Sequence, residues 1–305
     1  MSARIVFMGS PEFAVPVLRR LAEGPYPVVG VVTQPDRPSG RGRSLSAPPV
    51  KALAQTLGLP LIQPERLKDP PAMVQLQAWA PDLVVVAAFG QILRRAVLEL
   101  PRWGCLNVHA SLLPRWRGAA PIQAAILHGD PQTGVTLMRM DPGVDTGPLL
   151  SQRLTPILPD ETAGELAARL AELGAGLLLD TLPGYLAGEI QPQPQDHSQA
   201  TYAPLLNRAD GALDFHQPAE QLARRVRAFN PWPAAFIPWQ GQPLKILRAH
   251  AASGDAPPPG SRLNLGDLPA LSASPGLLVL DEVQPAGKRP MPGQVLLRGR
   301  RGWHA

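Results

Sequence analysis

The sequence predicts an α/β fold, with a mostly parallel sheet in the first part of the chain and a small β-barrel in the last part. Up to Asp145, apolar runs alternate with segments of helical spacing, which is typical of parallel strands joined by right-handed crossovers. One run, Leu83 to Ala88, is unbroken, as expected for a central strand covered on both faces. Beyond residue 204, short apolar runs alternate with Gly and Pro turns, which indicates a small barrel.

Length and composition favour two globular domains. The chain has 305 residues, and 45% hydrophobic against 17% charged residues provides material for a core and excludes global disorder. No apolar run is long enough to span a bilayer, and the amino terminus enters a strand at Ile5 without a secretory signal, so we expect a cytoplasmic protein that does not contact a membrane. The single cysteine, Cys105, excludes an internal disulfide and a zinc site built on several thiolates. Its apolar surroundings favour a core residue over a nucleophile.

The excess positive charge lies in the last third of the chain. The formal net charge is +5, and from Pro204 onward twelve Lys or Arg stand against seven Asp or Glu, whereas the earlier residues carry seventeen of each. A basic module after a neutral one favours a polyanionic partner such as RNA. A basic but uninvolved surface explains the charge equally well.

The first predicted elements are a strand over Ile5 to Met8, a turn over Gly9 to Glu12, and a helix that begins near Val15. The turn lacks the G-x-G-x-x-G spacing that brings a backbone close to a pyrophosphate, which disfavours a nicotinamide-dependent dehydrogenase. A second strand follows over Val28 to Thr33.

Gln34 to Pro49 is predicted to be a loop, because it is dense in Pro, Gly and Arg. It carries Arg37, Arg41 and Arg43. Such a loop cannot bury a face of its own, and it would stay mobile until it met a ligand. A solvated cationic linker is the alternative interpretation.

The middle of the chain supplies further elements. Val50 to Leu57 is predicted to be a helix that stops at Gly58, and two strands are predicted over Cys105 to Val108 and Thr136 to Met140. Thr162-x-x-Glu165 has the form of a capping box before a helix. Leucines repeat behind it at helical spacing and indicate core packing: Leu166, Leu170, Leu173 and Leu177.

The pattern breaks at the polar, Pro-rich tract Gln191 to Ala200, which we interpret as a linker. The predicted domains are therefore residues 1–188 and 204–305, with a linker over 189–203. In the second domain, Pro218 to Phe229 has helical spacing. Four apolar runs are candidate strands: Ala234 to Trp239, Leu244 to Ala249, Gly276 to Leu280 and Gln294 to Leu297.

Candidate catalytic residues gather between Gly104 and Leu150. Asn107 and His109 lie at the carboxyl end of a predicted strand, where ligands bind in open parallel sheets, and because side chains alternate they point to one side. Asp145 lies in a loop whose glycines and proline permit a tight path back over the cleft. A single histidine at a strand end is more often structural.

Three motifs in this stretch stand in the order and at the close spacing found in folate-dependent formyltransferases. They are Asn107-Val-His109, Ser111-Leu-Leu-Pro114 and Asp141-Pro-Gly-Val-Asp-Thr-Gly147. The chain resembles that family over nearly its whole length. The T-Q-P-D-R-P-S-G-R-G-R segment from Thr33 and the A-F-N-P-W-P segment from Ala228 are similar to the branch that formylates methionyl-initiator tRNA.

The resemblance implies a Rossmann-like formyltransferase domain and an OB-like tRNA-binding domain. It implies 10-formyltetrahydrofolate as the formyl donor, methionyl-initiator tRNA as the acceptor, and a role in the initiation of protein synthesis. Asn107, His109 and Asp145 match the family's catalytic residues. The implied folate site comprises Ser111, Leu112, Leu113, Pro114, Phe89, Gly90 and Ile92. The implied tRNA contacts are Arg37, Arg41, Arg43, Lys288 and Arg289.

These residue types suit formyl transfer. Attack by a neutral amine places negative charge on the former formyl oxygen, to which the Asn107 amide and a His109 imidazolium can donate, each worth about 3 to 4 kcal/mol in comparable sites. Asp145 would favour charged His109 and take up or relay the amine proton. No covalent intermediate and no metal is required, and we expect a monomer. Arg115 and Arg117 are candidates for contacts with the glutamate tail or RNA phosphates and are left unassigned.

Other interpretations remain open at this point. Formyltransferases that act on glycinamide ribonucleotide or an amino sugar nucleotide share the catalytic motifs, but they do not require the Arg-rich loop and the basic last third. A one-carbon hydrolase would use water in place of the amine. A pure RNA-binding protein is a different class, and the intact Asn107, His109 and Asp145 argue against it.

Overall fold

The computed structural model describes residues 2–39, 44–254, 257–298 and 303. These residues form two compact units. The first comprises Met1–Pro121, Gln132–Pro156 and Ala167–Tyr202, and the second comprises Ile122–Pro131, Ile157–Leu166 and Ala203–Ala305. Two short segments from earlier in the chain thus belong to the second unit. The predicted domain boundaries and the linker over 189–203 stay a prediction.

The first unit is built on a seven-stranded sheet with the order β10-β9-β7-β6-β1-β2-β5. Five of these strands, from β7 to β5 in that order, run parallel to one another. β6 lies in the middle of the sheet, and all its residues are buried, so the predicted central strand is confirmed. The strands are β1 (Ile5–Gly9), β2 (Val28–Val32), β5 (Leu61–Ile62), β6 (Leu83–Ala87), β7 (Cys105–His109), β9 (Gln132–Arg139) and β10 (Leu149–Pro156).

Strand β9 departs from the expected parallel pattern. It pairs antiparallel with both β7 and β10, so the predicted parallel arrangement is confirmed as far as β7 and is wrong for β9. An antiparallel neighbour needs no crossover across the sheet. Because Arg139 at the end of β9 lies opposite Leu106 near the start of β7, the loop after β9 must turn back to bring Asp145 to Asn107.

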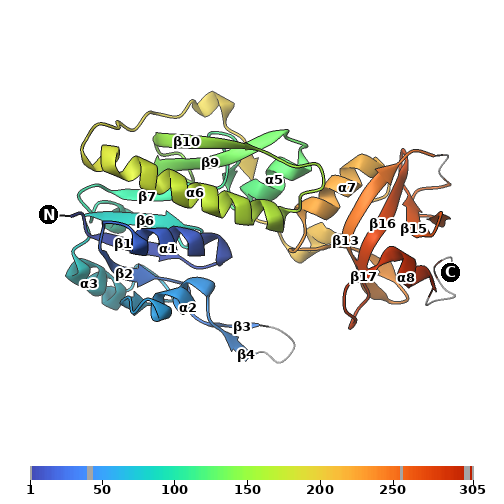
Figure 1. Ribbon diagram of the computed structural model, residues 1–305, viewed down its shortest axis with the longest axis horizontal. Coiled ribbons are helices and arrows are strands. Elements are labelled where there is room, and N and C mark those ends of the chain that lie inside the picture. Colours follow the sequence, from blue (N-terminus) through green and yellow to red (C-terminus); the bar gives the residue numbers. More distant parts are fainter. Residues whose placement is uncertain (1, 40–43, 255–256, 299–302, 304–305) are drawn as a thin grey trace. The chain divides into compact units, whose positions relative to one another are not determined.

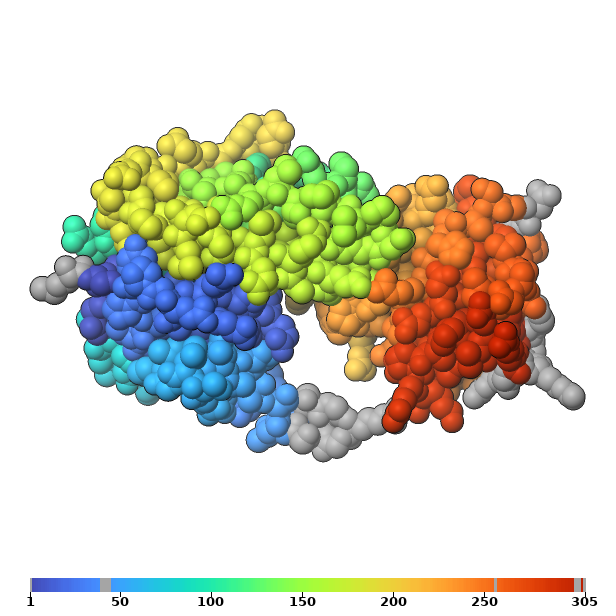
Figure 2. All heavy atoms as spheres, viewed as in Figure 1, coloured from blue at the N-terminus to red at the C-terminus, as the bar shows by residue number. Residues whose placement is uncertain are grey.

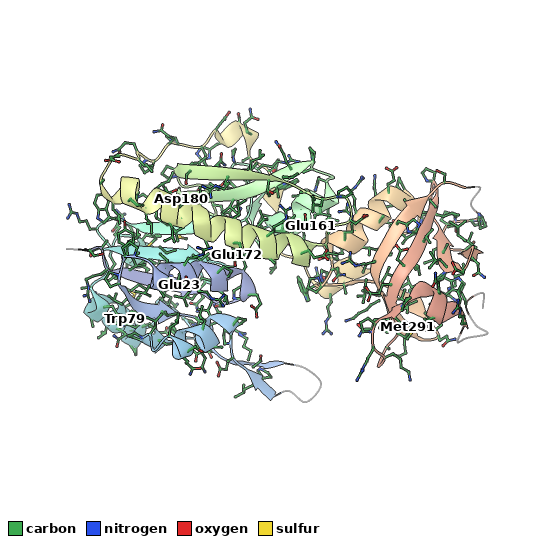
Figure 3. All side chains as sticks on the ribbon, viewed as in Figure 1. Glu23, Trp79, Glu161, Glu172, Asp180 and Met291 are labelled. Atoms are coloured by element: carbon green, nitrogen blue, oxygen red, sulfur yellow. The ribbon has the colours of Figure 1, made fainter. Side chains whose placement is uncertain are left out.

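Helices cover both faces of this sheet, and Figure 1 shows α1 and α6 side by side on one of them. Gly174 of α6 lies against Val108, where a Cβ would overlap the valine, so α6 passes directly over β7. On the other face, Trp79 of α3, labelled in Figure 3, packs against Gly30 of β2. In the space-filling view, side chains of α1, α2 and α6 cover the face of the first unit that is turned toward the viewer (Figure 2).

Proline and glycine mark several of the positions at which helices begin and end. Prolines occupy the first turns of α1, α2 and α3, where the missing N–H is not needed, and Gly58 follows α2 with φ +66°. The helices are α1 (Val15–Glu23), α2 (Pro49–Thr56), α3 (Pro70–Trp79), α4 (Arg95–Leu98), α5 (Pro121–Leu127) and α6 (Ala163–Leu186). The remaining short elements are η1 (Glu12–Ala14), β8 (Arg117–Gly118), η2 (His197–Gln199), β11 (Tyr202–Ala203) and η3 (Arg208–Gly211).

The predicted capping box at the start of α6 is confirmed. Glu165 Oε2 accepts hydrogen bonds from the backbone nitrogen and the hydroxyl of Thr162, both at 2.8 Å, and the Glu165 nitrogen donates to Thr162 Oγ1 at 3.3 Å. Each residue satisfies a donor that the helix end would otherwise leave unpaired. These hydrogen bonds hold the pKa of Glu165 far below its usual range, at about 2.

Part of the predicted loop from Gln34 to Pro49 is a hairpin. Strands β3 (Arg37–Ser39) and β4 (Ser44–Ser46) pair antiparallel, with Pro38 opposite Leu45. The prediction missed it because Pro is rare in strands, yet an edge position tolerates the missing N–H.

The second unit is an antiparallel sheet with the order β12-β13-β16-β15-β14, and β17 pairs with β16. Its core includes α7 residues Leu222 and Val226, so the predicted helix here is confirmed. The run Gln294 to Leu297, predicted to be a strand, lies in helix α8, which buries Leu296 on one side. The elements are β12 (Ala235–Trp239), β13 (Gln242–Ala252), β14 (Arg262–Leu265), β15 (Leu268–Ser272), β16 (Leu277–Gln284), β17 (Met291–Pro292), α7 (Ala219–Ala228) and α8 (Gly293–Arg298).

Candidate active site

Asn107, His109 and Asp145 meet at one place in the first unit. Asn107 and His109 lie two residues apart on β7 and therefore point to the same face of the sheet. Asn107 Nδ2 donates to Asp145 Oδ1 at 3.3 Å, and His109 Nδ1 lies 3.6 Å from the same oxygen. The structure thus brings together the amide, the imidazole and the carboxylate that the motifs indicated.

The two ring nitrogens of His109 face different partners. Nε2 lies 3.0 Å from the carbonyl oxygen of Trp116, and because a carbonyl only accepts, Nε2 carries a proton in this contact. Nδ1 faces Asp145 at a separation longer than an ordinary N–H···O hydrogen bond. The side chain is only 6% exposed. Nδ1 therefore keeps hydrogen-bonding capacity that a substrate group can use.

Asp145 is held by backbone as well as side-chain groups. Its Oδ2 accepts a hydrogen bond from the Gly118 nitrogen at 2.9 Å, and its side chain is 14% exposed. The residue has φ +51°, a left-handed conformation that Asp tolerates better than most residues. Inside the same loop, Asp141 Oδ1 accepts from the Gly143 nitrogen at 3.0 Å and from Thr146 Oγ1 at 2.6 Å.

The Ser111–Pro114 motif forms the turn after β7, and its polar groups bond within the protein. Ser111 is fully buried and donates to the carbonyl of Arg115 at 2.6 Å. Thr136 of β9 donates to the Ser111 carbonyl at 2.6 Å and accepts from the Leu113 nitrogen at 3.0 Å. Leu113 is also buried, whereas Leu112 and Pro114 are half-buried. The last two side chains are thus the ones that a ligand can reach.

The second predicted folate segment follows β6. Phe89 is buried in the core, Gly90 has φ +79°, and the Ile92 side chain is 82% exposed. Gln91 fixes this turn, because its Oε1 accepts from the Leu67 nitrogen at 2.7 Å and its Nε2 donates to Pro64 at 3.1 Å. An apolar side chain exposed on a fixed turn is suited to contact a flat ligand.

A cavity of about 440 Å³ lies between α4 and the loop that carries Asp145. Its volume is within the usual range for small-ligand sites. The cavity is lined by Arg95, Leu98, Glu99, Arg139, Met140, Asp141, Pro142 and Pro148. It borders Asp141 and Pro142, at the start of the loop that carries Asp145.

Cys105 is a core residue, as predicted. It is 1% exposed, its thiol donates to the Val97 carbonyl at 3.6 Å, and burial raises its pKa to about 12. A thiol in this state is not a nucleophile near neutral pH.

Two residues of the site were not found from the sequence. Arg117, left unassigned as a candidate for contacts with the glutamate tail or RNA phosphates, is 1% exposed and donates to Gln195 Oε1. Gln195, placed in the predicted linker, is buried and donates to the carbonyls of Asp145 and Gly147. No pattern in Gln191-Pro-Gln-Pro-Gln195 distinguishes the buried glutamine from its exposed neighbours. Arg115, in contrast, is exposed and stacks on Trp116 at 4.3 Å.

The predicted tRNA contacts lie in separate places. Arg37 is exposed on β3 in the first unit, and Lys288 and Arg289 are exposed after β16 in the second. Arg41 and Arg43 lie outside the described residues. Among the residues that the structure describes, no group of His, Cys, Asp and Glu could hold a metal ion. Within the same residues, no helix has the length and apolar character needed to cross a bilayer.

Two protein-family models match the chain in succession. One, described as formyl transferase, matches residues 3–182, and the other, described as formyl transferase, C-terminal domain, matches residues 205–301. The chain therefore belongs to the formyl transferase family. This confirms the resemblance drawn from the three motifs.

Close relatives carry a more specific name. The chain is 51% identical over 304 residues to a methionyl-tRNA formyltransferase of Roseiflexus sp. (strain RS-1), with 99% of this chain and 94% of the relative covered. It is 52% identical to the methionyl-tRNA formyltransferase of Halorhodospira halophila, with 99% and 97% covered.

Solved structures share the fold at low sequence identity. The methionyl-tRNA formyltransferase from Clostridium thermocellum matches with a TM-score of 0.58 at 17% identity, over 83% of this chain and 95% of that one. WlaRD, a sugar 3N-formyl transferase, matches with a TM-score of 0.69 at 18% identity, over 95% of this chain and 100% of that one. The predicted fold class, a Rossmann-like domain followed by an OB-type domain, is confirmed.

Proposed function

We propose that this chain transfers the formyl group of 10-formyltetrahydrofolate to the α-amine of methionyl-initiator tRNA, for the initiation of protein synthesis. The observation that carries the proposal is the convergence of Asn107, His109 and Asp145 in a chain about half identical to methionyl-tRNA formyltransferases over nearly its whole length. Because aminoacylated tRNA is made in the cytoplasm, we propose that location too, together with a monomeric state.

In this proposal, Asn107 and His109 stabilise the charge that develops on the formyl oxygen. The Asn107 amide has two donor hydrogens, and the one not bonded to Asp145 is available for that oxygen. His109 donates through Nδ1, the nitrogen not engaged with Trp116. Preformed donors of this kind lower the barrier by about 3 to 4 kcal/mol each.

Asp145 has two tasks in the same proposal. Its carboxylate faces Asn107 and His109 and so orients both donors. A carboxylate with partial exposure can accept the proton that the attacking amine loses, directly or through a water.

The folate would be held beside this site. The exposed side chains of Ile92 and Val144 provide apolar contacts for a flat ring, and the cavity next to α4 borders the loop that carries Val144. The Ser111–Pro114 turn would contribute Leu112 and Pro114. When bound, the donor supplies the activated formyl group, and the protein residues orient it and stabilise the developing charge.

The tRNA would be held by basic residues on both units. Arg37 on β3, with Arg41 and Arg43 beyond it in the chain, supplies one contact, and Lys288 and Arg289 supply another. The excess positive charge of the last third supports this assignment because phosphate contacts dominate nucleic-acid affinity.

The proposal is tested by formylation assays with a panel of acceptors. We expect transfer to charged methionyl-initiator tRNA, and none to uncharged tRNA, glycinamide ribonucleotide or an amino sugar nucleotide. Asn107→Ala and His109→Ala should each lower kcat by about 100- to 1,000-fold. A matched control is Asp180→Asn on α6, an exposed residue labelled in Figure 3. Wild-type kcat/KM in either alanine variant, or a nucleotide as the preferred acceptor, would refute the proposal.

A further inference from the structure

Two buried polar side chains, Arg117 and Gln195, lie behind the loop that carries Asp145, and the proposed reaction uses neither of them directly. Arg117 is 1% exposed and Gln195 is 6% exposed. They lie 78 residues apart in the sequence, and both belong to the first unit. Buried polar groups of this kind are retained only when their hydrogen bonds are satisfied.

The Gln195 side chain uses all its hydrogen-bonding capacity at this place. Nε2 donates to the carbonyl oxygens of Asp145 at 2.9 Å and Gly147 at 2.7 Å. Oε1 accepts from Arg117 Nε at 3.1 Å and from Arg117 Nη2 at 2.7 Å. Because carbonyls only accept and a guanidinium only donates, one orientation of the amide satisfies every partner. Arg117 therefore fixes the orientation of the Gln195 amide, with its NH2 group toward the loop.

The loop needs such support because its backbone is unusual at Asp145. The residue has φ +51°, a conformation that persists in a non-glycine residue only when the surroundings hold it. One of the two carbonyls that Gln195 binds belongs to Asp145 itself. Gln195 thus acts on the peptide unit that sets the direction of the carboxylate.

The short strand β8 holds the same residue from a second side. The Gly118 nitrogen donates to Asp145 Oδ2 at 2.9 Å, and the preceding residue is Arg117. The Arg117 nitrogen donates to the Thr201 carbonyl at 2.9 Å, which ties β8 to the segment that carries Gln195. Strand β8 therefore holds both parts of Asp145. Gly118 binds its carboxylate directly, and Arg117 acts on its main-chain carbonyl through Gln195.

We propose that Gln195, oriented by Arg117, is a positioning residue that holds Asp145 in the geometry required for formyl transfer. This inference rests on the proposed function. Gln195 lies in the segment that the sequence predicts to be a linker, and in this inference that segment affects the rate of the reaction.

The sharpest test is Gln195→Glu, which separates the two sets of hydrogen bonds. A glutamate keeps the acceptor for Arg117 and adds a charge, so the contact with the guanidinium is retained. It removes both donors and places a carboxylate against the carbonyls of Asp145 and Gly147. The matched control is Gln193→Glu, the same change at an exposed residue of the same segment.

We expect Gln195→Glu to lower kcat by about 10- to 100-fold, because small misplacements of catalytic groups have effects of this size. The KM values for tRNA and folate should change by less than about twofold, since the residue contacts neither in this arrangement. Gln193→Glu should have wild-type kcat. A Gln195→Glu enzyme with wild-type kcat would overturn the inference.

A second measurement distinguishes positioning from a general loss of structure. In the Asp145→Asn background, assayed by single turnover with excess enzyme, Gln195→Glu should lower the rate by less than about twofold, because residues that act through one another are not additive. An undiminished effect in that background would overturn the inference. If Gln195→Glu does not fold, Gln195→Met is measured instead, with the same expected loss of kcat. An inactive wild-type enzyme would refute the proposed function and with it this inference, whereas an active wild type with an unaffected Gln195→Glu variant would refute the inference alone.

Discussion

Replacement of Asp145 by asparagine tests the candidate site with the smallest change in shape. In the wild type, Oδ2 accepts from the Gly118 nitrogen and Oδ1 faces both Asn107 Nδ2 and His109 Nδ1. An asparagine offers one oxygen and one NH2 group. If its oxygen stays with Gly118, its NH2 group meets the NH2 group of Asn107, and two donors face each other.

The size of the effect follows from the charge and the distance. The Asp145 carboxylate accepts from Asn107 Nδ2 at 3.3 Å, and a hydrogen bond to a charged group contributes about 1.5 to 3 kcal/mol. Two NH2 groups that face each other then leave a donor without a partner, which adds to the loss. We expect a net loss of about 2 to 4 kcal/mol in transition-state stabilisation, which corresponds to a kcat lower by about 30- to 1,000-fold.

The assay is single-turnover formylation of methionyl-initiator tRNA at saturating formyl donor, with thermal unfolding measured in parallel. Asp180→Asn is the control, because its side chain is 65% exposed and pairs with Arg153 at the surface. We expect the control to have the wild-type rate. An Asp145→Asn enzyme with a rate within about threefold of wild type would refute the role given to the carboxylate.

Four further changes have expected outcomes. Cys105→Ser should leave kcat within about twofold of wild type, and iodoacetamide should not inactivate the native enzyme at pH 8, because its buried thiol has a pKa of about 12. Thr162→Ala should lower stability by about 1 kcal/mol at pH 7, measured by urea unfolding; the difference should shrink as the pH falls from 4.5 toward 2, where Glu165 becomes protonated. Gly147→Ala should abolish turnover in the formylation assay, because a Cβ there overlaps a backbone carbonyl. Arg41→Ala should raise the tRNA KM and leave the folate KM unchanged; an unaltered tRNA KM and kcat would count against the loop role.

The catalytic strand could be predicted because its signals are local. Alternation along β7 places Asn107 and His109 on one face whatever surrounds them. The unbroken run in β6 likewise requires burial on both faces. Motif spacing then added Asp145, although the turn of the chain that brings it there depends on β9, whose antiparallel direction no local pattern revealed.

The failures concern segments whose structure is decided by distant partners. Gln294 to Leu297 is apolar and short, so its pattern fits a strand or a helix equally well, and packing against the core selected the helix α8. The tract around Gln195 has the composition of a linker, and its burial follows from hydrogen bonds to residues about 50 and 78 positions away.

These hydrogen bonds also explain how the Asp145 carboxylate is positioned before any substrate binds. Asp145 is fixed at its carboxylate by Gly118 and at its carbonyl by Gln195. Asp141 braces the preceding part of the loop through Gly143. Electrostatic stabilisation is effective only when the charged and polar groups need not reorganise during the reaction. A left-handed residue held at both its carboxylate and its carbonyl meets that condition, and the unfavourable backbone conformation is then part of the preorganisation.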